Sequence, residues 1–228
     1  MCFENKTFKL FFSSEIFFIF SACTQAKADI VFILDSSGSM SKTEFGQIKR
    51  FVTDFLSDAD IDSGSVRVGV NVFSEKSHIK FHLNEYTSKT DLLTAVENIK
   101  YIRGGTNTAD AFKRTRTEMF TLNNGDRPNV DNIVILLTDG KSTRNTKRTI
   151  PEAQITRDAG IHVFAVAVGY KDFSELDEIA SKPIELNRFA IENFAELAEL
   201  KKKVFAAFCG KEICRFAQYP IIIAWGIE

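Results

Sequence analysis

Residues 29–34 read DIVFIL, and three later stretches of the chain are apolar in the same way. These stretches are VRVGVNVF at 66–73, NIVILL at 132–137 and IHVFAVAV at 161–168. Runs that are apolar at nearly every position, with little alternation, are typical of parallel strands in a sheet that helices cover on both faces. The four runs therefore predict the buried strands of an α/β sheet.

Segments with apolar residues at helical spacing separate these strands. The first is 42–57, and the others are 89–98, 107–119, 147–158, 173–180 and 191–207. Strands that alternate with helices, joined by right-handed crossovers, form a doubly wound, mostly parallel central sheet flanked by helices on both faces, a Rossmann-like arrangement. Residues 77–83 are expected to add an antiparallel edge strand, and residues 184–189 a short final strand.

The composition fits one large globular domain. The chain has 228 residues, of which 44% are hydrophobic and 26% charged, and these ordinary proportions argue against disorder and against a bundle of membrane helices. Lys and Arg (29) nearly balance Asp and Glu (30), so the net charge is -1. Because binding to a phosphate backbone needs an excess of positive charge, we expect no nucleic acid partner.

Residues 1–22 resemble a secretory signal peptide. Two lysines precede an apolar stretch at 10–20, and the segment ends in small residues. Glu4 and Glu15 depart from this pattern, which leaves an error in the gene model as the alternative. The stretch is too short and too interrupted for a transmembrane helix, so we expect a secreted, extracellular protein without a membrane span.

The four cysteines lie outside the predicted domain. Cys2 belongs to the predicted signal peptide, Cys23 precedes the first strand, and Cys209 and Cys214 follow the last helix. Cysteines that bracket a domain suit a disulfide between its ends, most simply Cys23–Cys209. Residues 209–228 differ in character from the rest and are interpreted as a Cys-containing tail, either the start of another module or a truncated reading frame.

Oxygen-bearing side chains follow the first strand at alternate positions, Asp35, Ser37 and Ser39. Alternate positions can converge on one point when a loop turns, and a Gly at 38 eases the turn because it accepts unusual backbone angles. Oxygen ligands favour hard cations, so we expect Mg²⁺, with Mn²⁺ or Ca²⁺ as alternatives, rather than zinc held by His or Cys.

Two further strand ends supply oxygen ligands, Thr106 in GGTNT at 104–108 and Asp139 in TDG at 138–140. In open α/β sheets, ligands bind beyond the carboxyl ends of the strands, near the point where the strand order reverses. The sequence therefore predicts one cation site where the three loops meet.

The motifs DSSGS at 35–39, GGTNTADAF at 104–112 and LLTDG at 136–140 resemble the metal-ion-dependent adhesion site (MIDAS) of von Willebrand factor A-type domains. Such domains occur in integrins, matrilins and collagen-associated proteins, and the resemblance covers about residues 27–208. It implies a domain for cell or matrix adhesion that binds protein through a divalent cation. The implied partner is an extracellular matrix or cell-surface protein, collagen-like or other, whose Glu or Asp completes the coordination of the ion.

Residue by residue, the resemblance implies direct ligation by Ser37 and Ser39. It implies ligation by Thr106 in the ligand-competent state, and action largely through water for Asp35 and Asp139. A cation touched mainly by neutral hydroxyls keeps a strong attraction for a partner carboxylate. Ala109 and Asp110 stand where the family often has a Gly, directly after the second Thr of this motif. We expect this departure to affect helix packing more than ligation.

Two hydrolase classes compete with this interpretation. A serine esterase using Ser37 would need a GxSxG elbow, which residues 36–39 lack. An aspartyl phosphatase using Asp35 usually needs a second acid at position 37. We therefore expect no enzyme. The remaining alternative is a structural or assembly module of a secreted multidomain matrix protein, whose contacts do not use the metal.

Basic residues follow the third motif directly, at Lys141, Arg144, Lys147 and Arg148. They either steer an acidic partner toward the metal or form an ordinary solvated helix face. Tyr170 and Phe173, beyond the strand at 161–168, are candidate contacts at the rim of the site.

Overall fold

The computed structural model describes residues 27–169 and 172–191. The predicted signal peptide, the Cys23–Cys209 pairing and the tail at 209–228 lie outside the described residues. So does the helix expected at 191–207, apart from Ile191, which ends a strand. None of the helices within the described ranges is long and apolar enough to cross a membrane.

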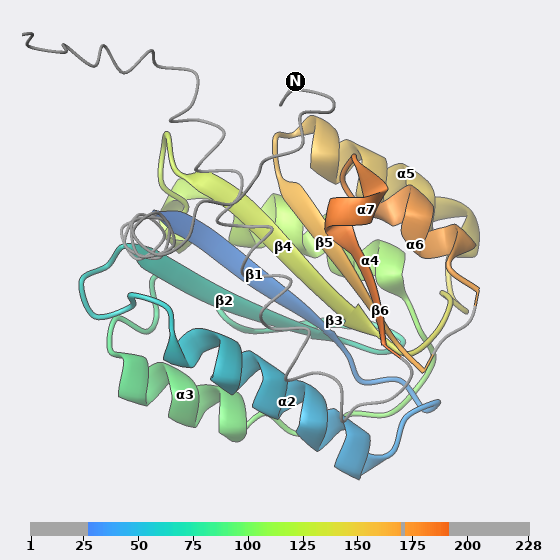
Figure 1. Cartoon of the computed structure of the whole chain (residues 1–228), viewed down its shortest axis with the longest axis horizontal. Coiled ribbons are helices and arrows are strands. Elements are labelled where there is room, and N and C mark those ends of the chain that lie inside the picture. Colours follow the sequence, from blue (N-terminus) through green and yellow to red (C-terminus); the bar gives the residue numbers. More distant parts are fainter. Residues whose placement is uncertain (1–26, 170–171, 192–228) are drawn as a thin grey trace, which may run out of the picture.

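A six-stranded sheet in the order β3-β2-β1-β4-β5-β6 forms the centre of the domain (Figure 1). Its strands are β1 (Ala28–Asp35), β2 (Val66–Phe73), β3 (Ser77–Phe81), β4 (Asp131–Thr138), β5 (His162–Val168) and β6 (Arg188–Ile191). All neighbouring pairs are parallel except β2 and β3, which are antiparallel. The structure thus confirms a doubly wound, mostly parallel sheet with an antiparallel edge strand.

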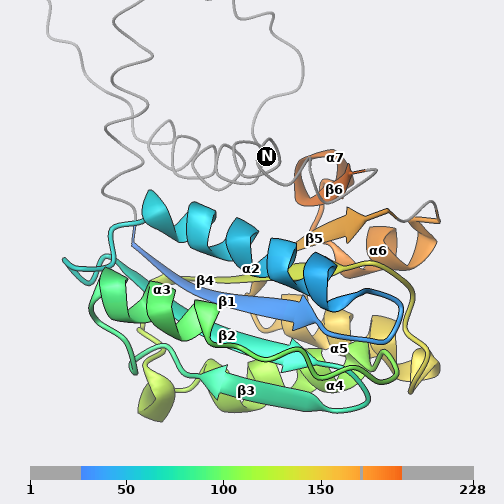
Figure 2. The same ribbon diagram turned by 90° about the horizontal axis from the view of Figure 1, so that it is seen from below.

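Helices cover both faces of this sheet (Figure 2). One face carries α2 (Lys42–Ser57) and α3 (Lys89–Glu97), and the other carries α4 (Thr108–Arg114), α5 (Thr146–Asp158) and α6 (Ser174–Ile179). All eight residues of β1 are buried, since Phe32 and its alternate neighbours pack toward α2 while Val31 and Ile33 pack toward α4 and α5. This two-sided burial explains why the strands are apolar without alternation.

The strand predicted at 184–189 was partly wrong. Residues Ile184–Asn187 form a helical turn, α7, and the strand begins only at Arg188. The Asn187 side chain stabilises this turn, because its amide donates to the Pro183 carbonyl at 2.8 Å and its oxygen lies 2.6 Å from His162 Nε2. These are tertiary contacts, which a local apolar pattern does not encode.

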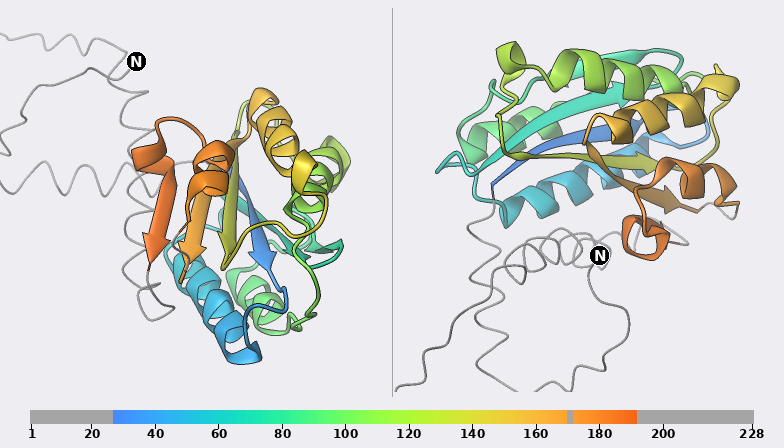
Figure 3. Two further views of the ribbon diagram at one scale, coloured as in Figure 1. Left: turned by 90° about the vertical axis from the view of Figure 1, so that its right-hand side faces the viewer. Right: turned by 90° about the horizontal axis from the view of Figure 1, so that it is seen from above.

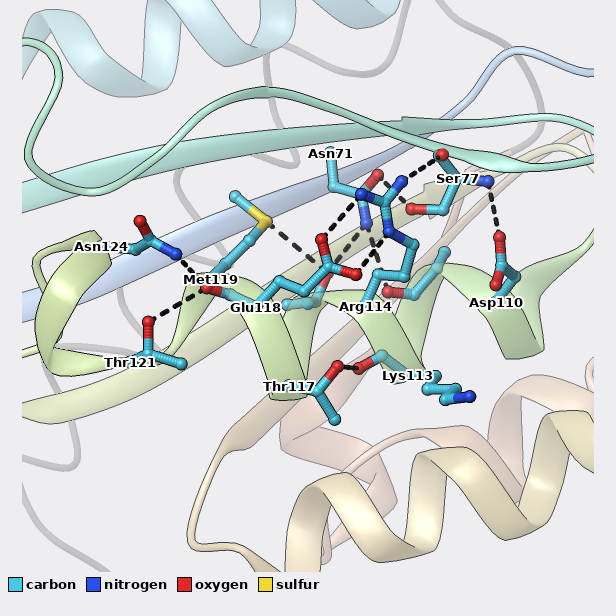
Figure 4. A network of polar contacts seen from close by, with 12 residues as sticks. Asn71, Ser77, Asp110, Lys113, Arg114, Thr117, Glu118, Met119, Thr121 and Asn124 are labelled. Atoms are coloured by element: carbon cyan, nitrogen blue, oxygen red, sulfur yellow. Dashed lines mark hydrogen bonds and ion pairs between the residues drawn. The ribbon is translucent and has the colours of Figure 1, made fainter.

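The helix predicted at 107–119 changes character partway along its length. It is α-helical to Arg114 and then forms a π-helical turn, η1 (Thr115–Met119); a short 3-10 turn, η2 (Leu122–Asn124), follows. The change coincides with a buried side chain of β2, Asn71, which donates to the Ala111 carbonyl at 3.2 Å and to Thr115 Oγ1 at 3.0 Å (Figure 4).

Further polar contacts fix α4 to the β2–β3 corner (Figure 4). The Asp110 carboxylate accepts the Ser77 amide at 2.8 Å, and Arg114 donates to the Ser77 carbonyl at 2.7 Å while it pairs with Glu118. Asp110 therefore has a role in helix packing, as expected for its departure from the family pattern. Because α4 begins two residues after Thr106, the same contacts fix the loop that carries this candidate ligand.

Candidate metal centre

The sheet order places the predicted site at the point where the chain direction across the sheet reverses. Strand β1 pairs with β2 on one side and with β4 on the other, so connections leave it in both directions. The parallel strands end at one edge of the sheet (Figure 3), and Asp35 and Thr138 are the last residues of β1 and β4 there. This is the position at which open α/β sheets bind ligands.

Four of the five predicted residues lie together at this edge. Asp35 Oδ1 accepts the Ser37 amide at 2.8 Å. The Ser37 and Ser39 hydroxyl oxygens are 2.8 Å apart, and the Ser39 hydroxyl donates to Asp139 Oδ1 at 2.8 Å. The other oxygen of Asp35 accepts the Thr138 hydroxyl at 2.7 Å. Loops that are about a hundred residues apart in the sequence therefore present one connected set of oxygen atoms.

The prediction that Thr106 follows a strand was wrong, because its loop connects α3 to α4. The residue reaches the same edge through its backbone. Its amide donates to Thr143 Oγ1 at 2.9 Å, and its carbonyl accepts the Thr143 and Arg144 amides at 2.8 and 3.0 Å. The residue is buried. Among the described residues, its hydroxyl makes no hydrogen bond to the other four predicted side chains, so the structure brings its loop to the site without linking its side chain to theirs.

Sequence reasoning missed three residues that hold this arrangement. Ser36 is buried, and its hydroxyl and carbonyl oxygens accept the amides of Ile102 and Arg103 at 2.8 and 2.9 Å. The Tyr101 hydroxyl donates toward the carbonyl of Ser37 at 2.9 Å, and Thr138 links β4 to Asp35. Ser36 and Thr138 stand inside the quoted motifs, whereas no feature of the sequence singles out Tyr101.

Burial controls the electrostatics of the two carboxyl groups. It raises the pKa of Asp35 to about 7; the nearby Asp139 raises it further, while hydrogen bonds from Thr138 and Ser37 oppose the shift. Burial likewise raises the pKa of the half-buried Asp139. A nearby positive charge would therefore stabilise the ionised form of both carboxyl groups. No group of three or more His, Cys, Asp or Glu side chains suited to a metal occurs within the described ranges, so the donor set here is one of hydroxyls and carboxylates.

The basic cluster after Asp139 is largely compensated by carboxylates. Lys141 pairs with Asp172, the Arg144 guanidinium lies 3.1 Å from Glu75, and Arg148 lies 2.7 Å from Glu152. These ion pairs favour the interpretation of a solvated face over that of a uniform positive surface.

Of the two aromatic candidates for the rim, the structure describes only Phe173. Phe173 is half-buried against the core formed with α6, and the Arg188 guanidinium lies 4.8 Å from its ring centre. Tyr170 falls outside the described residues.

The sequence model of the von Willebrand factor type A domain matches residues 29–203. The chain belongs to this family. Among its relatives, Matrilin-3 of Gallus gallus is 32% identical over 197 residues, and the Collagen alpha-4(VI) chain of Mus musculus is 35% identical over 191 residues. These matches cover 85% and 82% of the chain but only 43% and 8% of the two relatives, so the chain spans less than half of either.

The fold is also that of solved A-domain structures. Proximal thread matrix protein 1 from the mussel byssus superimposes with a TM-score of 0.76 at 27% identity, covering 81% of this chain and 48% of that protein. That structure is described as having a zinc-occupied MIDAS motif. The alignment spans most of the described α/β domain.

The raised pKa of Asp35 gives a prediction for the metal-free protein. Because the folded state holds this proton more tightly than the unfolded chain, whose Asp titrates near 3.8, the stability contribution is complete below about pH 4 and is lost as pH rises through about 7. Asp35→Asn removes this loss. We expect the variant in EDTA to be more stable than wild type by about 2 kcal/mol near pH 8, measured by urea unfolding.

The structure accommodates this substitution, because an Asn amide can donate to Thr138 Oγ1 while the Thr138 hydroxyl turns to the Gly140 carbonyl, 2.9 Å away. Asp54→Asn, on the exposed face of α2, serves as the control and should leave the pH dependence unchanged. A difference between wild type and Asp35→Asn that stays constant from about pH 5 to about pH 8 would show that Asp35 does not titrate in this range.

Proposed function

We propose that this domain binds protein partners through a divalent cation at a MIDAS, as an adhesion domain of a secreted protein. The proposed ligand set is Asp35, Ser37, Ser39, Thr106 and Asp139, and the proposed ion is Mg²⁺, with Mn²⁺ or Ca²⁺ as alternatives. The observation that carries the proposal is the continuous set of contacts from Asp35 through Ser37 and Ser39 to Asp139 at the switch point of the sheet.

The spacing of the two serines fits a small octahedral ion. Adjacent oxygen ligands about 2.1 Å from Mg²⁺ are about 3.0 Å from each other. The Ser37 and Ser39 oxygens are 2.8 Å apart, and Asp139 Oδ1 is 2.8 Å from that of Ser39. The spacing of Ser37 and Ser39 is therefore compatible with two adjacent ligands of one cation, and Asp139 lies close enough to act on it through water.

The carboxylates and the hydroxyls of the site have different roles: the carboxylates attract the cation, and the hydroxyls leave most of its charge uncompensated. Asp35 and Asp139 supply the negative charge that attracts a cation, and the burial of Asp35 and the partial burial of Asp139 strengthen this attraction. Ser37 and Ser39 provide neutral oxygens, which compensate little of the charge of an ion. When bound, the cation supplies an open coordination position for a carboxylate oxygen. A Glu or Asp of the partner is therefore the expected ligand.

The relatives support the matrix setting of this proposal. A matrilin, a collagen VI chain and a matrix protein of the mussel byssus share the domain, and the byssus protein holds a divalent metal at its MIDAS motif. By analogy we place this chain outside the cell, with a matrix or cell-surface protein, collagen-like or other, as its partner. The domain bounds of 27–208, the signal peptide at 1–22 and the Cys23–Cys209 disulfide belong to the same proposal.

A second candidate is an assembly module whose contacts do not use the metal. One observation favours it, because the site is already hydrogen-bonded within the chain. Ser39 donates to Asp139 and Thr138 donates to Asp35, so these carboxylates have protein partners of their own. The two candidates differ in whether removal of metal abolishes binding.

The first test is a calorimetric titration of Mg²⁺ into the full chain. We expect saturable binding by wild type and its loss in Ser37→Ala/Ser39→Ala, because the variant lacks two of the neutral oxygen ligands. Parallel titrations with Mn²⁺, Ca²⁺ and Zn²⁺ would rank the ions. Equal binding by wild type and the variant would contradict the proposed ligand set.

A matched control exists in the same chain. Ser63 and Ser65 also have hydroxyl oxygens 2.8 Å apart, next to the carboxylate of Asp60, but they precede β2 and lie at the other end of the strands. Ser63→Ala/Ser65→Ala should therefore bind Mg²⁺ as wild type does.

The second test addresses partner binding. We expect a surface coated with a short peptide containing one Glu to capture the chain in Mg²⁺, with capture lost in EDTA, lost in Asp35→Ala, and absent for the same peptide with Gln. Surface plasmon resonance would measure all four conditions. Capture that persists in EDTA, or that is equal for the Glu and Gln peptides, would favour the metal-independent module.

A further inference from the structure

The loop before Thr106 lies directly along the DSSGS loop. Ile102 and Arg103 donate their amides to Ser36, and the Gly38 amide donates to the Gly104 carbonyl at 2.8 Å. Hydrogen bonds on both sides of Arg103 therefore fix its backbone beside the candidate ligands.

Arg103 adopts a backbone conformation that is unusual for its side chain. Its φ is 64°, in the left-handed region that Gly and Asn adopt more readily. For other residues this conformation is strained, and such outliers concentrate at binding sites. The fold holds an arginine here at some cost in stability, which suggests that the side chain has a role of its own.

The Arg103 side chain crosses the DSSGS loop. A Cβ atom added to Gly38 would lie 3.6 Å from Arg103 Cγ and 3.8 Å from Arg103 Nε. Gly38 stands between Ser37 and Ser39, so the Arg103 side chain, as far as Nε, lies alongside the segment that carries the two candidate hydroxyl ligands. The same added Cβ atom would lie 3.3 Å from the Gly104 carbonyl oxygen, so the backbones of the two loops also approach closely here.

The charge of Arg103 is uncompensated within the described part of the chain. The residue is exposed, and no described carboxylate forms an ion pair with it. Arg144 offers an internal comparison, since its side chain packs against Gly105, next to Thr106, but is paired with Glu75 at 3.1 Å. Of these two arginines at the site, Arg103 is the one with charge available for a ligand.

We propose that Arg103 is a specificity-determining residue that selects partners presenting two neighbouring carboxylates, one for the cation and one for its guanidinium. The inference rests on the proposed function, because it assumes that a partner carboxylate binds at the MIDAS. A guanidinium beside a cation site repels the cation until an anionic ligand arrives. A monoacidic ligand leaves the guanidinium charge unpaired, whereas a diacidic ligand also forms a charge-assisted pair with it.

This arrangement has a thermodynamic signature. Removing the charge of Arg103 should leave Mg²⁺ binding without ligand unchanged or slightly tighter, while it weakens the binding of a diacidic ligand. A purely structural role would weaken both together. Because Arg103 is exposed, the expected loss for the diacid is modest, about 3- to 10-fold in Kd at low salt, and it should shrink as salt is added.

The experiment compares two labelled peptides. One contains two adjacent Glu residues, and in the other the second Glu is replaced by Gln. Fluorescence anisotropy with the full chain in Mg²⁺ gives the ratio of their Kd values, and calorimetry gives the Kd of Mg²⁺ alone. We expect wild type to prefer the diacid by about 3- to 10-fold, and Arg103→Gln to bind both peptides equally. Arg103→Asn, which tolerates the left-handed backbone, should match Arg103→Gln in this ratio and guards against misfolding. Arg50→Gln, on α2, is the control and should keep the wild-type ratio.

The outcomes distinguish failure of the proposed metal-dependent binding from failure of the proposed role of Arg103. Failure of both peptides to bind wild type in Mg²⁺ would overturn the proposed function and the inference with it. Equal binding of the two peptides by wild type would overturn the inference alone. Loss of both peptides and of Mg²⁺ binding in Arg103→Asn would assign the residue a structural role and also contradict the inference.

Discussion

The buried carboxylate of Asp35 is the constraint on which the rest of the site depends. A carboxylate at the end of a fully buried strand is costly unless it is protonated, hydrogen-bonded or paired with a cation. The fold gives it two hydrogen-bond donors, from Ser37 and Thr138, yet its pKa stays raised. The ionised form of Asp35 therefore remains disfavoured at the point where β1 meets β4. The hydroxyl oxygens of the DSSGS loop lie nearby, and a divalent cation bound there would stabilise the negative charge.

The architecture keeps the arrangement in place from several sides. Helices on both faces bury β1 completely, so its end is fixed relative to β2 and β4. The buried Asn71 and the ion-paired Arg114 hold α4 to the β2–β3 corner, and this fixes the loop of Thr106. The same loop carries Arg103 across Gly38. The scaffold thus determines both the position of the candidate ligands and the charge at their rim.

Much of the fold and the location of the site could be predicted from the sequence, and the reasons are physical. Strands buried on both faces are apolar at nearly every position, which allowed β1, β2, β4 and β5 to be predicted. The carboxyl ends of parallel strands must share an edge, which brought DSSGS and TDG together. The π-turn at Thr115 and the helical turn before Arg188 could not be predicted, because side chains distant in sequence stabilise them. Tyr101 and the path of Arg103 depend on how two loops pack, which no local pattern specifies.

We propose that Ser37 and Ser39 bind one divalent cation directly, with Asp139 beside it. The most direct test is a crystal structure of the chain grown with Mn²⁺ and measured for anomalous scattering. We expect an anomalous peak within about 2.3 Å of the Ser37 and Ser39 hydroxyl oxygens, a normal oxygen–metal distance. Well-ordered loops without such a peak, or a peak elsewhere on the domain, would contradict it.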